Sequence, residues 1–390
     1  MYDLILIRYG EIGLKGDNRP FFINKLISSI KTICRPLGEF TVQKSRGRIF
    51  LIPENSTAQY LNRLKKIPGI VSASPATAVE LDFPAVKKAA LKMVQKKLRE
   101  IETPASFRVQ TNRANKDFHL NSLEVNSRLG AHILQNTEGL TVDLENPELT
   151  VELDIRSKNI YLFINRIPGP GGLPVGTSGR GLLLLSGGID SPAAGWLALK
   201  RGISLEAVHF HTPPYTGQRA RQKVLDLTDI LSESGVHIKL HLVHFTEIQR
   251  AIKKNCPEKY LITIMRRMMF RIASRIAEKN DLQVLVTGEC IGQVSSQTLE
   301  NISVIRSTAN LPVLRPLIGY NKQEIIQLAK EIETYNISRR PHQDCCTVFV
   351  PKHPATRPHH EEVVRAEKNI NPDQLMVNID EKIEIIDFEQ

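Results

Sequence analysis

The sequence predicts an α/β multidomain protein, with smaller α+β units followed by a doubly wound parallel sheet. Length is the first reason, because 390 residues exceed what one small domain needs. Strand-like and helix-like segments then alternate with hairpins up to residue 165. After a stretch rich in Gly and Pro, short apolar strands alternate with helices, which is typical of a parallel sheet covered on both faces.

The amino-terminal segments fit a small ferredoxin-like unit. "YDLILIRYG" predicts a strand, residues 19–33 a helix, and "FTVQKSRGRIFLI" a hairpin. The helical spacing of apolar residues in "AQYLNRLKKIPGI" stops at Pro68 and Gly69, where we expect the next helix to end.

Basic residues are frequent in the segments that follow. "PAVKKAALKMVQKKLRE" predicts an amphipathic helix with a basic face, and "ASFRVQTNRANKDF" predicts a strand that enters a basic loop. "NSLEVNSRLGAHILQN" predicts a further helix and "LTVELDIRSKNIYLFI" a hairpin.

The composition changes between Arg166 and Gly181. "RIPGPGGLPVGTSGRG" is rich in Gly and Pro and has no apolar periodicity, so it predicts a boundary or flexible connector. Beyond it, strands are predicted at residues 182–185, 203–210, 236–245 and 282–287, and helices at 192–200, about 218–233 and near 258–279.

Positive charge is shared by both main parts of the chain. The formal net charge is +11; residues 1–176 hold 25 Lys and Arg against 17 Asp and Glu, residues 177–360 carry +9, and the last 30 residues carry −6. Clustered Lys and Arg neutralise phosphates, so binding of a polyanion is the natural hypothesis. A basic protein with a merely solvated surface is the alternative.

Composition also indicates the compartment. No apolar run reaches membrane-spanning length, and "MYDLILIRYGE" lacks the basic flank of a secretory signal. Five cysteines, an odd number, argue against a disulfide framework and for a reducing compartment. We therefore expect a cytoplasmic protein without a membrane partner.

The stretch "LLLLSGGIDSPAAGWLALKRG" at residues 182–202 predicts an anion site. Ligands of open parallel sheets lie beyond the carboxyl ends of the strands, where Ser186, Gly187 and Gly188 follow directly. The glycines let the backbone approach a ligand, and the helix N-terminus, which Ser191 is expected to cap, adds partial positive charge. Asp190 is expected to act on phosphates through Mg²⁺.

The pattern excludes two common phosphate motifs. Neither G-x-x-x-x-G-K-[ST] nor G-x-G-x-x-G is present. A lysine serves enzymes that act on the β- and γ-phosphates, whereas a cradle that grips pyrophosphate and exposes the α-phosphorus needs none. A tight strand–helix turn that merely requires glycine is the structural alternative.

"SGGIDS" resembles the PP-loop of the adenylating ATP pyrophosphatases. Other stretches resemble one branch of them, the tRNA 4-thiouridine synthetases: "RYGEIGLKGDNRPFF" at 8–22, a THUMP-like segment at 107–133, "RRMMFRIAS" at 266–274, "TGECIGQVSSQT" at 287–298 and "LRPLIGYNK" at 314–322. The resemblance implies a ferredoxin-like domain at 1–60, a THUMP RNA-binding domain at 61–166, a linker at 167–180 and a PP-loop (adenine nucleotide α-hydrolase-like) domain at 181–390.

For activity, the resemblance implies that ATP activates the 4-oxygen of uridine 8 in tRNA, with release of pyrophosphate, before sulfur replaces that oxygen. Gly288 would let the nucleotide pass close to the backbone, and Gln297 would offer its amide to a base or ribose. Of Arg266 and Arg267, at least one is expected on a solvated helical face, and Arg266 is favoured for the nucleotide. The implied ATP-binding residues are Leu184, Leu185, Ser186, Gly187, Gly188, Asp190, Ser191, His209, Phe210, Arg266, Gly288 and Gln297; ordinary sheet core is the alternative for Leu184, Leu185, His209 and Phe210.

The THUMP-like half is expected to grip tRNA through phosphates and 2′-hydroxyls, without reading sequence. A homodimer would let one subunit hold the tRNA on which the other acts, although no residue indicates it. The candidate contacts are Arg108, Arg113, Lys116, Lys92 and Lys96, with Lys87, Lys88 and Lys97 on the same helix.

Sulfur chemistry is expected in "HQDCCTVFVPKHP" at 342–354. The resemblance favours Cys346, with Cys345 second, as the thiol that attacks a persulfide or carries the sulfur. Cys34 and Cys256 are interpreted as buried bystanders, and nothing makes Cys290 catalytic. A metal site built from this segment's histidines and cysteines (His342, Cys345, Cys346 and His353) lacks the usual C-x-x-C pairing.

Some members of the family continue into a rhodanese domain, and no such module follows the acidic tail here. The sulfur is therefore expected from a separate donor: a cysteine desulfurase, another persulfide carrier, or sulfide. The same absence argues against the thiazole branch of thiamine synthesis, which that domain serves in some relatives.

Two other functions stay open. The first is a PP-loop enzyme that transfers a different nucleophile, an amine such as ammonia or lysine. Alternatively, the chain is an RNA-binding protein with a degenerate nucleotide fold, although the intact S-G-G-x-D-S string argues against this.

Overall fold

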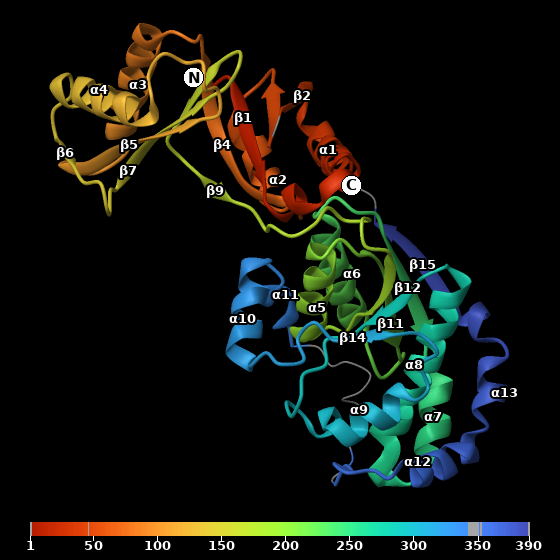
Figure 1. Cartoon of the computed structure of the whole chain (residues 1–390). Helices are drawn as coiled ribbons and strands as arrows, with labels where there is room; N and C mark the ends of the chain where they lie inside the picture. Colours follow the sequence, from red (N-terminus) through yellow and green to blue (C-terminus); the bar gives the residue numbers. More distant parts are fainter. Residues whose placement is uncertain (1, 46, 342–350, 352, 389–390) are drawn as a thin grey trace. The chain divides into compact units, whose positions relative to one another are not determined.

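The structure is a computed structural model, and it describes residues 2–45, 47–341, 351 and 353–388. The chain divides into two compact units. The first comprises Met1–Arg19 and Cys34–Gly171, and the second comprises Pro20–Ile33 and Gly172–Gln390. Figure 1 labels the elements of both units along the chain.

The first unit is built on one nine-stranded sheet, in the order β2-β3-β1-β4-β8-β7-β5-β6, with β9 paired to β4. The predicted strands, helices and both hairpins of this region are confirmed. In the first 171 residues the strands are β1 (Leu4–Tyr9), β2 (Phe40–Ser45), β3 (Arg48–Pro53), β4 (Ile70–Val79), β5 (Ala105–Arg113), β6 (Leu140–Val142), β7 (Leu149–Ile155), β8 (Ile160–Phe163) and β9 (Ile167–Pro168), and the helices are α1 (Arg19–Cys34), α2 (Thr57–Leu64), α3 (Phe83–Leu98) and α4 (Ser122–Gln135).

Strand β4 joins the two halves of this sheet, and the sequence pattern did not predict it. It pairs antiparallel with β1 through Ile5 opposite Pro75, and antiparallel with β8 through Thr77 opposite Leu162. Its sequence, "IVSASPATAV", is rich in small residues of low strand propensity and contains a proline. Pairing on both sides therefore stabilises a strand that its own residues specify weakly.

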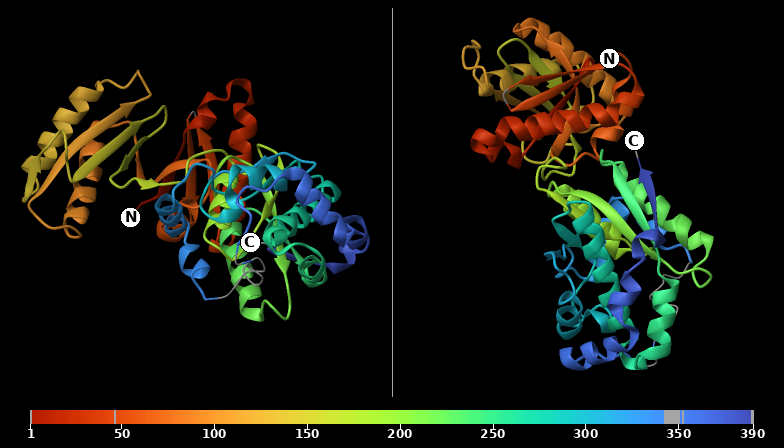
Figure 2. Two further views of the ribbon diagram at one scale, coloured as in Figure 1. Left: turned by 90° about the horizontal axis from the view of Figure 1, so that it is seen from below. Right: turned by 90° about the vertical axis from the view of Figure 1, so that its right-hand side faces the viewer.

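Helices α3 and α4 cover one face of the β5–β7–β8 part of the sheet (Figure 2). Their apolar residues pack with Phe107, Val151 and Leu162 in one core. Side-chain caps fix where both helices begin. Asp82 accepts from the backbone N–H of Ala85, and Asn121 forms a reciprocal capping box with Glu124.

The second unit contains the predicted doubly wound parallel sheet, in the order β14-β13-β10-β11-β12-β15. The first four pairings are parallel. Its strands are β10 (Arg180–Leu184), β11 (Ser204–His211), β12 (Ile238–His244), β13 (Val284–Val286), β14 (Val313–Leu314) and β15 (Ile383–Phe388), and its helices beyond α1 are α5 (Asp190–Lys200), α6 (Gln218–Ser232), α7 (Thr246–Asn255), α8 (Leu261–Lys279), α9 (Leu299–Arg306), α10 (Lys322–Glu331), α11 (Tyr335–Ser338), α12 (His360–Glu367) and α13 (Pro372–Met376).

Helices cover both faces of this sheet, as predicted (Figure 1). Alternate residues of β10 separate the two cores: Leu183 packs with α5 and α6, and Leu182 packs with α7 and α8. The acidic tail supplies β15, which pairs antiparallel with β12 at the edge of the sheet and was not predicted. Among the described residues, no helix is both long and apolar enough to cross a membrane.

The Gly/Pro-rich segment is held by hydrogen bonds in both units: up to Gly171 it bonds to β4 and its flank in the first unit, and from Gly172 onward it bonds within the second unit. Leu173 N–H donates to Lys200 O at 2.9 Å, and Gly176 N–H donates to Gly202 O at 2.8 Å. Gly172 has a φ of +75°, and a Cβ there would lie 2.1 Å from Lys200 O. Both the left-handed backbone and the close approach require glycine at this position.

Gly172→Ala is therefore expected to destabilise the second unit by well over 2 kcal/mol, because a left-handed alanine alone costs about 1–2 kcal/mol and the clash adds to it. Gly171→Ala is the matched control, since Gly171 has a φ of +68° but nothing within 4 Å of its Cβ position. Differential scanning calorimetry measures both. Equal midpoints for the two variants would contradict the role of the close contact.

Candidate active site

A cavity of about 260 Å³ lies at the carboxyl ends of β10, β11 and β13. It has an apolar wall and a polar end, so it suits a ligand that is part aromatic and part anionic. Of the twelve residues predicted for ATP, nine line it, and Leu185, Gly187 and Gly188 do not. The lining residues are Leu184, Ser186, Asp190, Ser191, His209, Phe210, Ile262, Arg266, Met269, Phe270, Thr287, Gly288, Glu289, Ser296 and Gln297.

Two serines close the turn between β10 and α5. The hydroxyl of Ser191 accepts from Ser186 N–H at 2.9 Å and lies 3.1 Å from Ser186 O. Ser186 Oγ accepts from Gly188 N–H at 3.2 Å. The prediction that Ser191 caps α5 is wrong, because Ile189 is the N-cap residue and no side chain caps it. Ser191 instead binds back to the turn, which leaves the helix N-terminus facing the cavity.

Three of the four residues for which ordinary sheet core was the alternative are buried: Leu185, His209 and Phe210. Leu185 is buried, and its N–H donates to Val208 O at 2.9 Å. His209 is buried with Nδ1 2.9 Å from Leu185 O, and the ring of Phe210 packs edge-on against Phe245. His209 and Phe210 nevertheless line the cavity as well, so core packing and ligand contact are compatible there.

Gly288 is required for a reason other than the predicted one. A Cβ at this position would lie 2.7 Å from the carbonyl carbon of Asp190 and 2.7 Å from the nitrogen of Ser191. Backbone of α5 therefore occupies the side of Gly288 on which a Cβ would lie. The glycine therefore lets the segment after β13 pack against the first residues of α5, although it still lines the cavity.

Glu289 is a buried carboxylate that sequence reasoning missed. It accepts from Arg266 at 2.5 Å, from Arg315 Nε at 2.6 Å and from Thr287 Oγ1 at 3.0 Å. Burial raises the pKa of Glu289, but the charges of Arg266 and Arg315 outweigh burial and hold that pKa below its ordinary value. The ionised carboxylate thus fixes Arg266 beside the cavity. An acid three residues after a buried strand was the available signal.

The prediction that Arg266 or Arg267 lies on a solvated helical face is wrong. Arg267 is 2% exposed and forms two hydrogen bonds with Glu367, at 3.1 and 2.8 Å. Its third contact is Val304 O at 2.6 Å. Arg267 therefore secures α12 and α9 to α8, while Arg266 one residue earlier turns toward the cavity.

A lysine reaches the glycine turn from a distant part of the chain. Lys322, the first residue of α10, donates to Asp190 Oδ1 at 2.8 Å. The turn itself has no lysine, so its local sequence did not reveal this contact. The Asp190 side chain stays 26% exposed, and a single carboxylate suits Mg²⁺, which takes most ligands from phosphates and water. Asp190 would hold such an ion together with bound phosphates.

Cys345 and Cys346 lie outside the described residues, but both flanks of their segment are held beside the cavity. Before it, Ser338 Oγ donates to Gly188 O in the glycine turn at 3.2 Å. After it, Thr298 donates to Thr356 O at 2.7 Å, and Asn301 donates to Ala355 O at 2.9 Å. Thr298 directly follows the lining residue Gln297.

The other cysteines agree with the bystander interpretation. Cys34, Cys256 and Cys290 are buried and free. Burial raises the pKa of Cys34 to about 12 and that of Cys256 to about 11, so both thiols stay protonated. Of the suggested metal ligands only His353 is described, and the described residues contain no cluster of three or more His, Cys, Asp or Glu side chains that would hold a metal.

The basic residues predicted to bind tRNA lie in the first unit, in two settings. Lys88, Lys92 and Lys96 are exposed at successive turns of one face of α3, with Lys116 exposed in the loop after β5. Arg108 and Arg113 also support structure: Arg108 donates to Leu144 O at 3.0 Å, and Arg113 donates to Leu120 O at 2.9 Å. Lys87 lies over the ring of Phe83, and Lys97 pairs with Glu100.

Models of three protein families match consecutive parts of the chain. The "ThiI ferredoxin-like domain" matches residues 4–74, the "THUMP domain" matches 80–165, and "Thiamine biosynthesis protein (ThiI)" matches 176–371. With the parallel sheet and its glycine turn, these matches define the class: PP-loop enzymes that carry a THUMP domain.

Whole-chain relatives define the family within that class. A protein of Halothermothrix orenii named "Probable tRNA sulfurtransferase" is 54% identical over 100% of this chain and 99% of its own length, and one of Thermoanaerobacter sp. with the same name is 47% identical over 98% and 99%. The crystal structure of a 4-thiouridine synthetase–RNA complex with bound ATP superposes with a TM-score of 0.90, at 43% identity over 100% of both chains. The chain belongs to the ThiI family of tRNA sulfurtransferases.

Gly288→Ala is expected to displace the first residues of α5 and to weaken ATP binding about tenfold or more. A distortion that costs about 1.4 kcal/mol of binding free energy raises the dissociation constant tenfold. Gly319→Ala is the matched control, since nothing lies within 4 Å of its Cβ position. Isothermal titration with ATP measures both. Unchanged affinity in Gly288→Ala would contradict the packing role.

His211, at the end of β11, predicts a pH dependence of stability. Burial, followed by the neighbouring His209 and His244, lowers the pKa of His211 to about 4 from an ordinary value of 6.5. Below pH 6.5 His211 binds a proton in the unfolded chain, whereas in the folded chain it stays neutral down to about pH 4. The free energy of unfolding therefore falls as the pH drops from 6.5 to about 4. The Tm of His211→Gln should fall less between pH 7 and pH 5 than that of the unmodified chain. His119→Gln, at an exposed position, should keep the steeper slope, and equal slopes would contradict this assignment.

Proposed function

We propose that this chain is an ATP-dependent tRNA sulfurtransferase that adenylates the 4-oxygen of uridine 8 and replaces it with sulfur to give 4-thiouridine. One observation carries the proposal: residues far apart in sequence line one cavity that combines apolar side chains with Ser186 of the glycine turn and Asp190 and Ser191 of α5. Membership of the tRNA sulfurtransferase family supports the class of reaction.

The cavity supports a definite orientation of ATP. Leu184, Phe210 and Met269 offer apolar surface to the adenine, and Gln297 offers an amide at the rim. The glycine turn and the N-terminus of α5 lie at the other end, where partial positive charge favours phosphates. The α-phosphorus then lies between the two ends, exposed to an incoming uridine oxygen.

Two charged pairs support the chemistry at the phosphates. Lys322 beside Asp190 supplies a positive charge where pyrophosphate would leave, and Asp190 would hold Mg²⁺ on the phosphates. Bound Mg²⁺ would supply charge neutralisation. Arg266, held by Glu289, presents a further guanidinium beside the cavity, where negative charge develops as the adenylyl group transfers.

Cys346 is proposed as the residue that handles sulfur after activation, with Cys345 as the alternative. Both flanks of its segment are held beside the cavity, through Ser338 on one side and through Ala355 and Thr356 on the other. A thiolate at Cys346 would attack the inner sulfur of a carrier's persulfide, form a disulfide with the carrier and free sulfide, which attacks C4 of the activated uridine with AMP as the leaving group. Alternatively, a persulfide on Cys346 would attack C4 with AMP as the leaving group, and a second thiol would then cleave the S–S bond, which leaves 4-thiouridine on the tRNA and a disulfide between the two thiols. A separate persulfide carrier, a cysteine desulfurase or sulfide would supply the sulfur.

The tRNA would be held by the first unit. The exposed lysines of α3 and Lys116 support non-specific contact with phosphates, and such binding weakens steeply with salt. Individual contacts, the domain bounds at residues 60, 166 and 180, and a homodimer all stay predictions. So does a cytoplasmic location, which the tRNA substrate favours.

Cys346→Ser separates activation from sulfur transfer. The variant is expected to keep tRNA-stimulated ATP–pyrophosphate exchange within about twofold and to lose 4-thiouridine formation, because only the second step needs the thiol. Exchange of labelled pyrophosphate and the near-ultraviolet absorbance of thiouridine measure the two steps, with unmodified tRNA, ATP, Mg²⁺ and a persulfide donor, because free sulfide would bypass a thiol that releases sulfide.

The controls separate the competing functions. Cys290→Ser, a buried cysteine outside the proposed chemistry, should keep both steps. Asp190→Asn should lower exchange by at least about tenfold, since it removes the charge that holds Mg²⁺ on the phosphates. Normal thiolation in both Cys346→Ser and Cys345→Ser would refute the sulfur step. The absence of any ATP–pyrophosphate exchange, with or without tRNA, would favour an RNA-binding protein with a degenerate nucleotide fold, and exchange without thiolation from any donor would favour amine transfer.

A further inference from the structure

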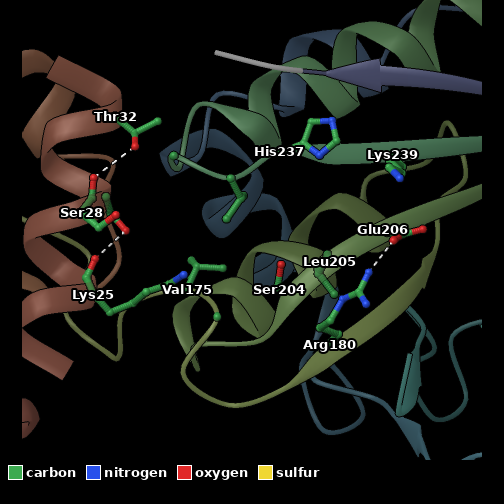
Figure 3. A pocket seen from close by; sticks show the side chains of 14 residues that line it. Lys25, Ser28, Thr32, Val175, Arg180, Ser204, Leu205, Glu206, His237 and Lys239 are labelled. Carbon is green, nitrogen blue, oxygen red and sulfur yellow. Dashed lines mark hydrogen bonds and ion pairs between the residues drawn. The ribbon is translucent and has the colours of Figure 1, made fainter. Parts of the chain in front are cut away.

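A second cavity lies at the opposite end of the parallel sheet from the candidate active site. It measures about 390 Å³, and all of its lining residues belong to the second unit. Arg180, Ser204 and Lys239 line it at the amino ends of β10, β11 and β12, and Lys25 of α1 faces them across the opening (Figure 3). Because the candidate active site is at the carboxyl ends of the same strands, the two cavities are separate.

Cationic side chains outnumber carboxylates in this lining. Glu206 is the one carboxylate among the lining residues, and it is already paired: Arg180 donates to it at 2.9 Å, and His241 Nε2 lies 2.7 Å from its other oxygen. Burial raises the pKa of Glu206, but His241, Arg180 and Lys239 together hold that pKa below its ordinary value. Glu206 is thus ionised, and Arg180 balances its charge.

Lys25 and Lys239 supply the positive charge in excess. Among the described residues, neither ammonium group forms an ion pair. Lys25 extends over Gly176 of the connector, where a Cβ would lie 3.1 Å from its Nζ and where φ is +82°. The glycine therefore lets the lysine lie along the cavity wall, and two positive charges face a polar space without a carboxylate of their own (Figure 3).

The remaining lining residues indicate the chemistry of a ligand. Ser28 and Ser204 offer hydroxyls, whereas Ser29 and Thr32 donate theirs to carbonyls of α1, at 3.2 and 3.1 Å. His237 is the one aromatic ring among the lining residues, and it pairs with Asp387 at 3.0 Å. The cavity therefore offers charge and hydroxyl donors from several directions but little surface on which a base would stack.

We propose that this cavity binds a phosphate group, held by Lys25 and Lys239 with the hydroxyls of Ser28 and Ser204. Ammonium and hydroxyl donors on both walls of the cavity suit phosphate, whose tetrahedral oxygens accept from several directions, better than a planar carboxylate. The phosphate is either a backbone phosphate of the tRNA, an alternative that rests on the proposed function, or free inorganic phosphate.

The test compares the unmodified chain with the double variant Lys25→Gln/Lys239→Gln. Lys31→Gln/Lys254→Gln is the matched control, because it removes the same charge at exposed positions outside the cavity. Lys25→Arg/Lys239→Arg keeps the charge and should keep binding, so a general folding defect is recognisable. Thermal midpoints of all four proteins are measured in parallel.

Two probes distinguish the source of the phosphate. A backbone phosphate predicts that tRNA affinity, by fluorescence anisotropy between 50 and 200 mM salt, falls about fivefold or more in the double variant beyond the control, with a salt slope shallower by about one. Free phosphate predicts that calorimetric titration with inorganic phosphate detects binding that the double variant loses about tenfold, at unchanged tRNA affinity.

Equal binding of both probes by the double variant and the control would overturn the proposal. Thiolation of tRNA by the unmodified chain is assayed separately. If thiolation fails while the difference in inorganic phosphate binding persists, only the proposed function falls. If thiolation succeeds while neither probe distinguishes the variants, only the phosphate site falls.

Discussion

The candidate active site depends on one close approach between two backbone segments. The residue after β13, Gly288, packs directly on the peptide between Asp190 and Ser191, with no room for a side chain. That contact sets where α5 begins relative to the carboxyl edge of the sheet. The hydroxyls of Ser186 and Ser191 accept hydrogen bonds from backbone N–H groups of the turn. No side chain caps α5, so its N-terminus faces the cavity.

Charge at the site is arranged on the same framework. Glu289 is almost fully buried between two arginines. Removing one partner of a buried ion pair typically lowers the free energy of unfolding by about 3–5 kcal/mol, because an unpaired charge stays buried. Such a pair is a poor source of stability compared with apolar packing, but it fixes the direction of Arg266. The pair between Asp190 and Lys322 is more exposed, so water and ions screen it and it can rearrange around a ligand.

The parallel sheet of the second unit thus has two polar ends with different characters. Its carboxyl end combines an apolar wall with backbone donors and suits a nucleotide. Its amino end carries lysines and hydroxyls with little apolar or aromatic surface and suits a bare phosphate. The excess of Lys and Arg over Asp and Glu in the second part of the chain is therefore not spread evenly: part of it balances buried carboxylates, and part remains available at the amino end of the sheet.

Local patterns in the sequence determined the class of the fold, most of its elements and the glycine turn. Apolar runs bounded by glycine predicted the central parallel strands, and S-G-G-x-D-S marked the turn, because these features are encoded by neighbouring residues. The sequence pattern did not predict strand β4, because its small residues form a strand only when two partner strands flank it. Strand β15 was not predicted either, because the acidic tail forms an edge strand only by pairing with β12.

Tertiary structure alone decided the contacts between distant residues. Lys322 meets Asp190, and Arg315 meets Glu289, across long stretches of chain that no periodicity relates. It also decided which of two adjacent arginines faces the cavity and why Gly288 is glycine. The physical reason is the same in each case: hydrogen bonds and steric contacts act over a few ångströms in space, whereas sequence patterns report only what lies nearby along the chain.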